Sequence, residues 1–167
     1  MANLDLIIAA WEVSHWEFTL AFEGLSDENL WKRPHPTLLS IGELAGHVAY
    51  YDAVRFTGPG PDTKPDLSLV KVQSPLIDAR FTYYLANINE PVVLNLTTAE
   101  VVAELKRIND EAKAVIASEA RDSDDKIPGF PDDTWGKTLE YQIFHVAYHT
   151  GQAYSVRHLL GDTPPDN

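Results

Sequence analysis

The first 25 residues carry hydrophobic positions with the period of a helix that packs on one side. The seam positions recur at alternating steps of four and three, at Leu4, Ile8, Trp11, His15, Phe18, Phe22 and Leu25. Such a seam follows one face of a helix and is typical of helical bundles. Gly24 and the polar residues 26–29 predict that this helix ends there and that a short helical turn follows.

Two further helices begin at capping sequences. Ser40-Ile-Gly-Glu43 and Thr97-Thr-Ala-Glu100 each place a glutamate three residues after a serine or threonine, the form of a capping box. The first opens a helix that runs through Phe56 and ends at the Gly-Pro-Gly-Pro sequence of residues 58–61. The second opens a helix with an apolar stripe, which consists of Val101, Val102, Leu105, Ile108, Ala112, Val115 and Ile116.

The segment from Gly58 to about Thr97 separates these two helices and contains five prolines. It has no sustained apolar pattern, so we expect a long crossover rather than a second domain. One short helix is expected around residues 76–86, and residues 91–96 could form an extended piece.

A last helix is predicted to begin near Thr138 and to run to Leu160, with Gly161 as the residue that ends it. A loop over residues 127–137 precedes this helix, and residues 162–167 are expected to form a disordered tail. The sequence therefore predicts one all-α domain over residues 1–161, a four-helix bundle. Its long crossover between the second and third helices permits an order other than up-down-up-down.

Composition narrows the partners and the chemistry. The 167 residues include 13 Lys and Arg against 25 Asp and Glu, a net charge of −12, which repels phosphate backbones and anionic lipids. We therefore expect no nucleic-acid partner and no membrane association. The N-terminus lacks the basic region of a secretory signal, so a cytoplasmic location is expected. No cysteine is present, so any metal must be bound by nitrogen and oxygen.

Two histidines four residues apart, His145 and His149, lie on one face of the last predicted helix. Their β-carbons would be about 5–6 Å apart, so both rings could reach one ion. The alternative is a pair of buried polar side chains that are satisfied by hydrogen bonds. Val146 stands where a zinc protease of the H-E-x-x-H type has glutamate, which argues against that class.

His47, in the middle of the second long helix, is the candidate third ligand. Three imidazoles would leave one coordination position open, as in catalytic rather than structural zinc sites. Gly46 and Gly151, beside two of these histidines, would allow neighbouring helices to approach closely. The nearest carboxylates are Glu43, which the cap uses, and Asp52, which falls on another face, so no general base is identified.

Several other residues are candidates for a pocket around the histidines. His15 lies on the seam of the first helix and could face the pocket, or it could be a core histidine. His35 and His158 are expected to be a loop residue and an exposed residue. Five aromatic residues could line the pocket, form a subunit interface or belong to the core. They are Trp11, Trp16, Tyr50, Tyr51 and Tyr148.

Two motifs together resemble the DinB/YfiT-like superfamily. The first is Ser40-Ile-Gly-Glu-Leu-Ala-Gly-His47, of the form S-I-x-E-L-x-x-H, and the second is His145-Val-Ala-Tyr-His149-Thr-Gly-Gln152, of the form H-x-x-x-H-x-G-Q. The resemblance covers both ends of the chain and is poor across residues 58–93. It implies an up-down-down-up bundle that is frequently a homodimer, with zinc or nickel bound by His47, His145 and His149.

The resemblance also implies a choice of functions. Characterised members include transferases and isomerases in which the metal activates a low-molecular-weight thiol such as bacillithiol, mycothiol or glutathione. On this analogy we expect a metal-dependent thiol S-transferase that acts on a small molecule, in which Gln152 orients a ligand and His15 and Tyr51 lie near the site. The alternatives are a metal-dependent hydrolase and a dimeric bundle that binds a metal or ligand without turnover.

Overall fold

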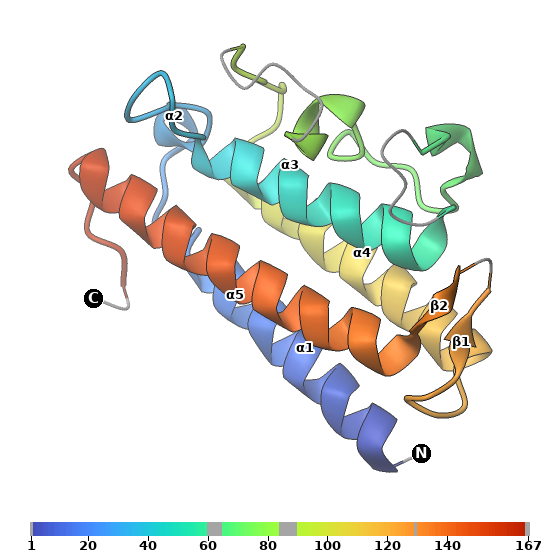
Figure 1. The fold of residues 1–167 in the computed structure, drawn as a ribbon. Helices are drawn as coiled ribbons and strands as arrows, with labels where there is room; N and C mark the ends of the chain where they lie inside the picture. Colours follow the sequence, from blue (N-terminus) through green and yellow to red (C-terminus); the bar gives the residue numbers. More distant parts are fainter. Residues whose placement is uncertain (1, 60–64, 84–89, 129, 166–167) are drawn as a thin grey trace.

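Four long helices form a bundle in the computed structural model, which describes residues 2–59, 65–83, 90–128 and 130–165. They lie side by side in Figure 1 and are α1 (Ala2–Leu20), α3 (Ile41–Asp52), α4 (Thr98–Glu119) and α5 (Trp135–Leu159). A single helical turn, α2 (Asp27–Leu30), follows α1. The prediction of an all-α bundle is confirmed.

The two pairs of helices run in opposite directions. In Figure 1, α1 and α5 lead away from the end of the molecule that holds the small sheet, whereas α3 and α4 lead toward it. Helix α5 packs against both α1 and α3, and α3 packs against α4. The described parts of the crossover lie along α3 in Figure 1, and α3 and α4, which run in the same direction, pack next to each other.

The seam of α1 packs into the core as its spacing predicts. Trp11 and Phe18 are fully buried, and Leu4 and Phe22 are nearly so. Phe18 and Phe22 belong to a cluster with residues of α3 and α4, whereas Leu4 and Trp11 belong to a second cluster near the start of α5. Each large apolar side chain that is buried stabilises the fold by about 1.5–3 kcal/mol.

The capping boxes predicted at both helix starts are present. The Ser40 hydroxyl accepts from the backbone N–H of Glu43, and the Glu43 carboxylate accepts from the backbone N–H of Ser40. Thr97 and Glu100 make the same reciprocal pair. At the other end of α5, Gly161 has a φ of +80°, the left-handed conformation that glycine adopts readily.

The tail expected to be disordered starts with an anchored residue. The Asp162 carboxylate accepts from Arg157 Nε at 2.9 Å and lies 2.8 Å from Arg157 Nη2. Residues 166 and 167 lie outside the described residues.

The segment before α5 differs from the prediction of a loop. Lys126–Ile127 (β1) and Phe130–Thr134 (β2) form a two-stranded antiparallel sheet. Helix α5 begins at Trp135 rather than near Thr138, because the Thr134 side chain caps it by accepting from the backbone N–H of Lys137.

The second long helix and the crossover also differ in detail from the prediction. After Asp52, α3 continues as a π-helical turn, η1 (Ala53–Thr57). The crossover contains two short 3-10 helices, η2 (Leu67–Leu69) and η3 (Ala79–Thr82), in place of one helix over residues 76–86. Residues 84–86 of that prediction lie outside the described residues, and residues 91–96 form no strand.

Within the described ranges, we find no helix that combines the length and the apolar character needed to cross a bilayer.

Candidate metal centre

The three predicted histidines meet between α3 and α5. His145 Nε2 lies 3.1 Å from His47 Nε2 and 3.2 Å from His149 Nε2. All three side chains are buried, with 6–8% of their surface exposed. They are the one group of potential metal ligands that comes together among the described residues. The structure therefore joins His47 to a pair that is 98 residues away in the sequence.

The outer ring nitrogens of two histidines define their tautomers. His47 Nδ1 lies 2.6 Å from the Phe81 carbonyl oxygen, and His149 Nδ1 lies 2.7 Å from Gln152 Oε1. Both oxygens can only accept, so both Nδ1 atoms carry the hydrogen and both Nε2 atoms present a lone pair to the centre. His145 can then donate from Nε2 to one of them at most.

The spacing of these nitrogens fits a bound divalent ion. Nitrogens about 2.0–2.1 Å from one tetrahedral ion lie roughly 3.3 Å from each other, within a few tenths of an ångström of the two distances here. Imidazole suits zinc and nickel among other divalent ions. His145 Nδ1 is buried without a hydrogen-bond partner among the described residues, so its tautomer is free to adapt to the ion.

Burial keeps all three imidazoles neutral. Burial, and then repulsion from His149, lowers the pKa of His47 to about 4. For His145, burial is again the largest cause, and the repulsion that its histidine neighbours would exert when protonated adds to it, so its pKa is lowered to about 2. Burial also lowers the pKa of His149. At neutral pH the site therefore offers three unprotonated ligands without first losing protons.

Acid should destabilise the metal-free protein through these histidines. His47 has a pKa of about 4 in the fold against 6.5 in an unfolded chain, so between these values the unfolded chain binds more protons. The free energy of unfolding is therefore not reduced by His47 above pH 6.5. Protonation of His47 in the unfolded chain lowers this free energy by about 3 kcal/mol as the pH falls to about 4. Urea denaturation between pH 7.5 and 4 measures the slope. The slope should be shallower in His47→Gln, and a slope as steep as that of the wild type would contradict this cause.

The histidines open onto a pocket with aromatic walls. Its volume is about 390 Å³, and its lining consists of the three histidines with Leu39, Tyr83, Tyr141, Phe144, Tyr148 and Gln152. Tyr83 has a φ of +51°, an uncommon conformation for a side chain of this size. Its hydroxyl donates to the Glu43 carbonyl oxygen at 3.2 Å, which fixes its ring beside His47.

Two of the other predicted pocket residues lie at the histidines. Gln152 lines the pocket, accepts from His149 and donates from Nε2 to the Tyr148 hydroxyl at 3.1 Å. The Tyr51 ring contacts His47 and His145 edge-on, with ring centroids 4.9 and 5.5 Å away, but Tyr51 does not line the pocket.

His15 lies outside this pocket. Its Nε2 is 3.0 Å from Asp52 Oδ2, and its ring packs edge-on against Trp11. It lines a separate hollow between α1 and α4 that also includes the exposed Trp16.

Sequence reasoning missed Arg55, and it placed Asp52 on another face without predicting its partners. Asp52 is 1% exposed, and its Oδ1 accepts from Gln142 Nε2 at 3.1 Å. This carboxylate is therefore buried and hydrogen-bonded outside the pocket. The Arg55 guanidinium lies over the Tyr141 ring, 4.9 Å from its centroid, and its charge also lowers the pKa of His145. The spacing of His47, Tyr51 and Arg55 at steps of four was the available signal.

The two glycines next to the histidines have different roles from the one predicted. A β-carbon on Gly46 would lie 2.6 Å from three atoms of the Phe81 ring. Gly46 therefore allows the crossover, rather than another helix, to approach α3 closely. A β-carbon on Gly151 would have no neighbour within 4 Å, so the prediction of a close helix approach there is wrong.

Gly46→Ala should therefore weaken both the fold and the site. The added methyl group must displace the Phe81 ring, and overpacking of this kind costs about 1–3 kcal/mol. The same shift moves the Phe81 carbonyl that holds His47, and loss of such an outer contact typically lowers metal affinity by about 10–100-fold. Gly151→Ala, in open space on α5, is the matched control. Thermal unfolding and metal titration of both variants provide the measurement, and equal behaviour of the two would contradict the role of Gly46.

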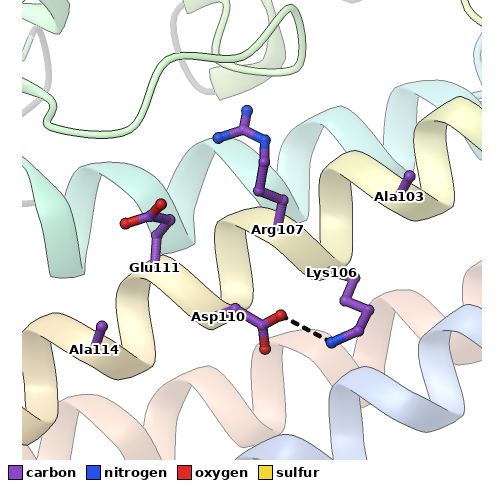
Figure 2. Close-up of a pocket in the computed structure, with 6 residues that line it drawn as sticks. All are labelled: Ala103, Lys106, Arg107, Asp110, Glu111 and Ala114. Atoms are coloured by element: carbon purple, nitrogen blue, oxygen red, sulfur yellow. Dashed lines mark hydrogen bonds and ion pairs between the residues drawn. The ribbon is translucent and has the colours of Figure 1, made fainter.

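A larger hollow on the outer face of α4 does not have the features of a site. Figure 2 shows its lining, which is Ala103, Lys106, Arg107, Asp110, Glu111 and Ala114. Lys106 pairs with Asp110 at 2.8 Å, and Arg107 pairs with Glu104 at 2.6 Å. This surface is a charged helix face whose basic groups are paired with acidic neighbours on the same helix.

Fold and site together define a helical bundle with a buried three-histidine cluster that could hold a metal ion. A model of the DinB superfamily matches residues 10–153, and the chain belongs to this superfamily. The match also includes the crossover, a part of the chain in which the resemblance based on the two motifs is poor. No match was found among the curated proteins or among the solved structures.

Proposed function

We propose that the protein is a metal-dependent enzyme that transfers a small thiol onto an electrophilic carbon. The observation that supports this most is the convergence of three neutral imidazoles at an open pocket. Three ligands leave a coordination position for a substrate, whereas a structural site is closed by four. Zinc and nickel are the ions that we propose.

The metal would supply Lewis acidity, which lowers the pKa of a thiol bound beside it. In the reaction the thiol loses its proton, the sulfur forms a bond to the electrophilic carbon, and the leaving group departs with the bonding electron pair. The proton is released to solvent or to the leaving group. The residues of the chain have to bind, orient and desolvate the two reactants.

The lining of the pocket favours a thiol over water as the nucleophile. Its described residues include no carboxylate, lysine or arginine that could act as a general base. The Tyr83 hydroxyl is committed to the Glu43 carbonyl, and burial raises its pKa, so it stays protonated. A thiol with a pKa of about 8.5 needs far less help to ionise than water at 15.7. Hydrolysis is therefore the second candidate.

Other residues around the site have supporting roles. The Phe81 carbonyl and Gln152 hold two imidazoles in the tautomer that binds metal. Tyr83, Phe144 and Tyr148 provide aromatic surface for the organic part of a substrate.

A metal-loading and activity assay tests the proposal. Protein purified without a polyhistidine tag is loaded with zinc or nickel and assayed for conjugation of glutathione to an activated aryl chloride and for hydrolysis of nitrophenyl acetate. We expect conjugation that depends on the ion and stops with a chelator. Ion-dependent hydrolysis without conjugation would replace the transferase by a hydrolase. Neither activity would leave a bundle that binds the ion without turnover.

We also propose a homodimer, because α1 presents large apolar side chains to solvent. Leu6, Val13 and Trp16 are 70%, 56% and 57% exposed and lie along one side of the helix. Large exposed apolar surface on a soluble chain commonly marks an interaction site. Trp16→Glu should shift the mass measured by light scattering from two chains to one. An unchanged mass would exclude this face as the interface.

A further inference from the structure

A second hollow along α5 adjoins the pocket at the histidines. This hollow has a volume of about 280 Å³, and its lining is Thr37, Leu38, Leu39, Leu44, Gln152, Ser155, Val156 and Leu159. Leu39 and Gln152 line both hollows, so the two adjoin at the side chain that holds His149. We call the two adjoining hollows the groove, and the three histidines lie at one end of it.

The far part of the groove is apolar and uncharged. Five of its eight lining residues are aliphatic, and none is charged, in a chain in which 23% of the residues are. Its polar side chains are already bonded: the Ser155 hydroxyl donates to the Gly151 carbonyl oxygen, and Thr37 Oγ1 lies 2.9 Å from His35 Nδ1. Gln152 is bonded to His149 and Tyr148. The groove therefore offers contact with hydrocarbon and little recognition of polar groups.

Two exposed aliphatic side chains from different segments border the groove. Leu38, in the loop before α3, is 41% exposed, and Leu159, at the end of α5, is 63% exposed. From His149 to Leu159 the helix rises about 15 Å, so the groove has the length of an extended hydrocarbon chain rather than of a compact ring.

We infer that this groove binds the uncharged aliphatic chain of a substrate whose reactive end lies at the three histidines. The inference rests on the proposed function and adds the class of substrate: an amphiphile with an alkyl or acyl chain and a metal-binding head. Contact of each methylene with the groove contributes to affinity, and the aromatic walls near the metal accommodate the functional group next to the chain.

Binding of straight-chain alkanethiols to the zinc-loaded protein tests the inference. Calorimetry with ethanethiol, butanethiol, hexanethiol and octanethiol should show affinity that rises up to about fourfold per methylene. Leu159→Glu and Leu38→Glu should remove the gain for octanethiol and leave ethanethiol unchanged. Both side chains are exposed, so neither change should disturb folding. Leu69→Glu, also exposed but outside the groove, is the matched control.

Straight-chain alcohols separate the groove from the metal. They lack a thiol, so the rise in thermal midpoint of the metal-free protein from ethanol to octanol reports the chain alone. A flat response in both series overturns the inference, whether or not thiols bind the metal. A steep alcohol series without any binding of thiols contradicts the proposed function and supports the groove. A length dependence that Leu159→Glu and Leu38→Glu leave intact places the chain elsewhere and overturns the inference.

Discussion

His149→Ala should lower the affinity of the protein for zinc by more than about 100-fold, because it removes one of three ligands while changes in outer contacts already cost 10–100-fold. Only two protein ligands, His47 and His145, would remain, and the ion would have one more coordination position without a protein ligand. The contact between His149 Nδ1 and Gln152 is lost as well. Thiol transfer should fall with metal occupancy.

His158→Ala is the matched control for this experiment. His158 lies on the same helix and is exposed, so its removal should leave metal affinity and helix content unchanged. Competition titration with a chromogenic chelator measures affinity, and circular dichroism verifies the fold. Equal affinities in the two variants would show that the three-histidine cluster does not bind the metal.

Glu43→Ala should destabilise the protein by about 3–5 kcal/mol, the usual effect of leaving one partner of a buried ion pair without the other. Glu43 is fully buried, and its carboxylate accepts from Arg33 Nε at 2.8 Å and from Arg33 Nη2 at 2.5 Å. It also accepts from the backbone N–H groups of Ser40 and Val92 at 2.8 and 2.9 Å. One side chain thus joins the loop before α3, the cap of α3 and the end of the crossover.

Glu104→Ala provides a comparison for that result. Glu104 pairs with Arg107 on the surface of α4, where such a pair contributes about 0–1 kcal/mol. Urea denaturation of both variants measures the two losses. A loss for Glu43→Ala as small as that for Glu104→Ala would mean that the buried pair does not hold the crossover. Because the crossover contributes Phe81 and Tyr83 to the site, zinc affinity should fall in Glu43→Ala as well.

Local signals in the sequence predicted the helices and the histidines of the cluster. The seam of α1 and the two capping boxes each depend on residues within a few turns of one helix. The local sequence is therefore enough to predict them. His145 and His149 share a face because helix geometry places residues four apart together. His47 was predicted from its place in the middle of the second long helix and from the motif over residues 40–47.

Other parts of the site depend on contacts between distant segments and could not be predicted in this way. Asp52 lies outside the pocket, as its place on another face of α3 predicts, but its contact with His15 of α1 was not predicted, because packing between helices decides which faces meet. Phe81 holds His47 from a crossover without any periodic pattern, and its position depends on the missing side chain of Gly46.

The short sheet was missed for a chemical reason. Proline and aspartate are uncommon in strands, and β2 contains Pro131, Asp132 and Asp133, so its composition indicated a loop. The π-helical turn after Asp52 has no sequence signal that we recognise.

An anomalous difference map from crystals of the untagged protein grown with zinc tests the central claim most directly. The account predicts one strong peak between α3 and α5, about 2.0–2.1 Å from the Nε2 atoms of His47, His145 and His149. A map without a peak at this position, or a peak that only two of the three rings reach, would contradict it.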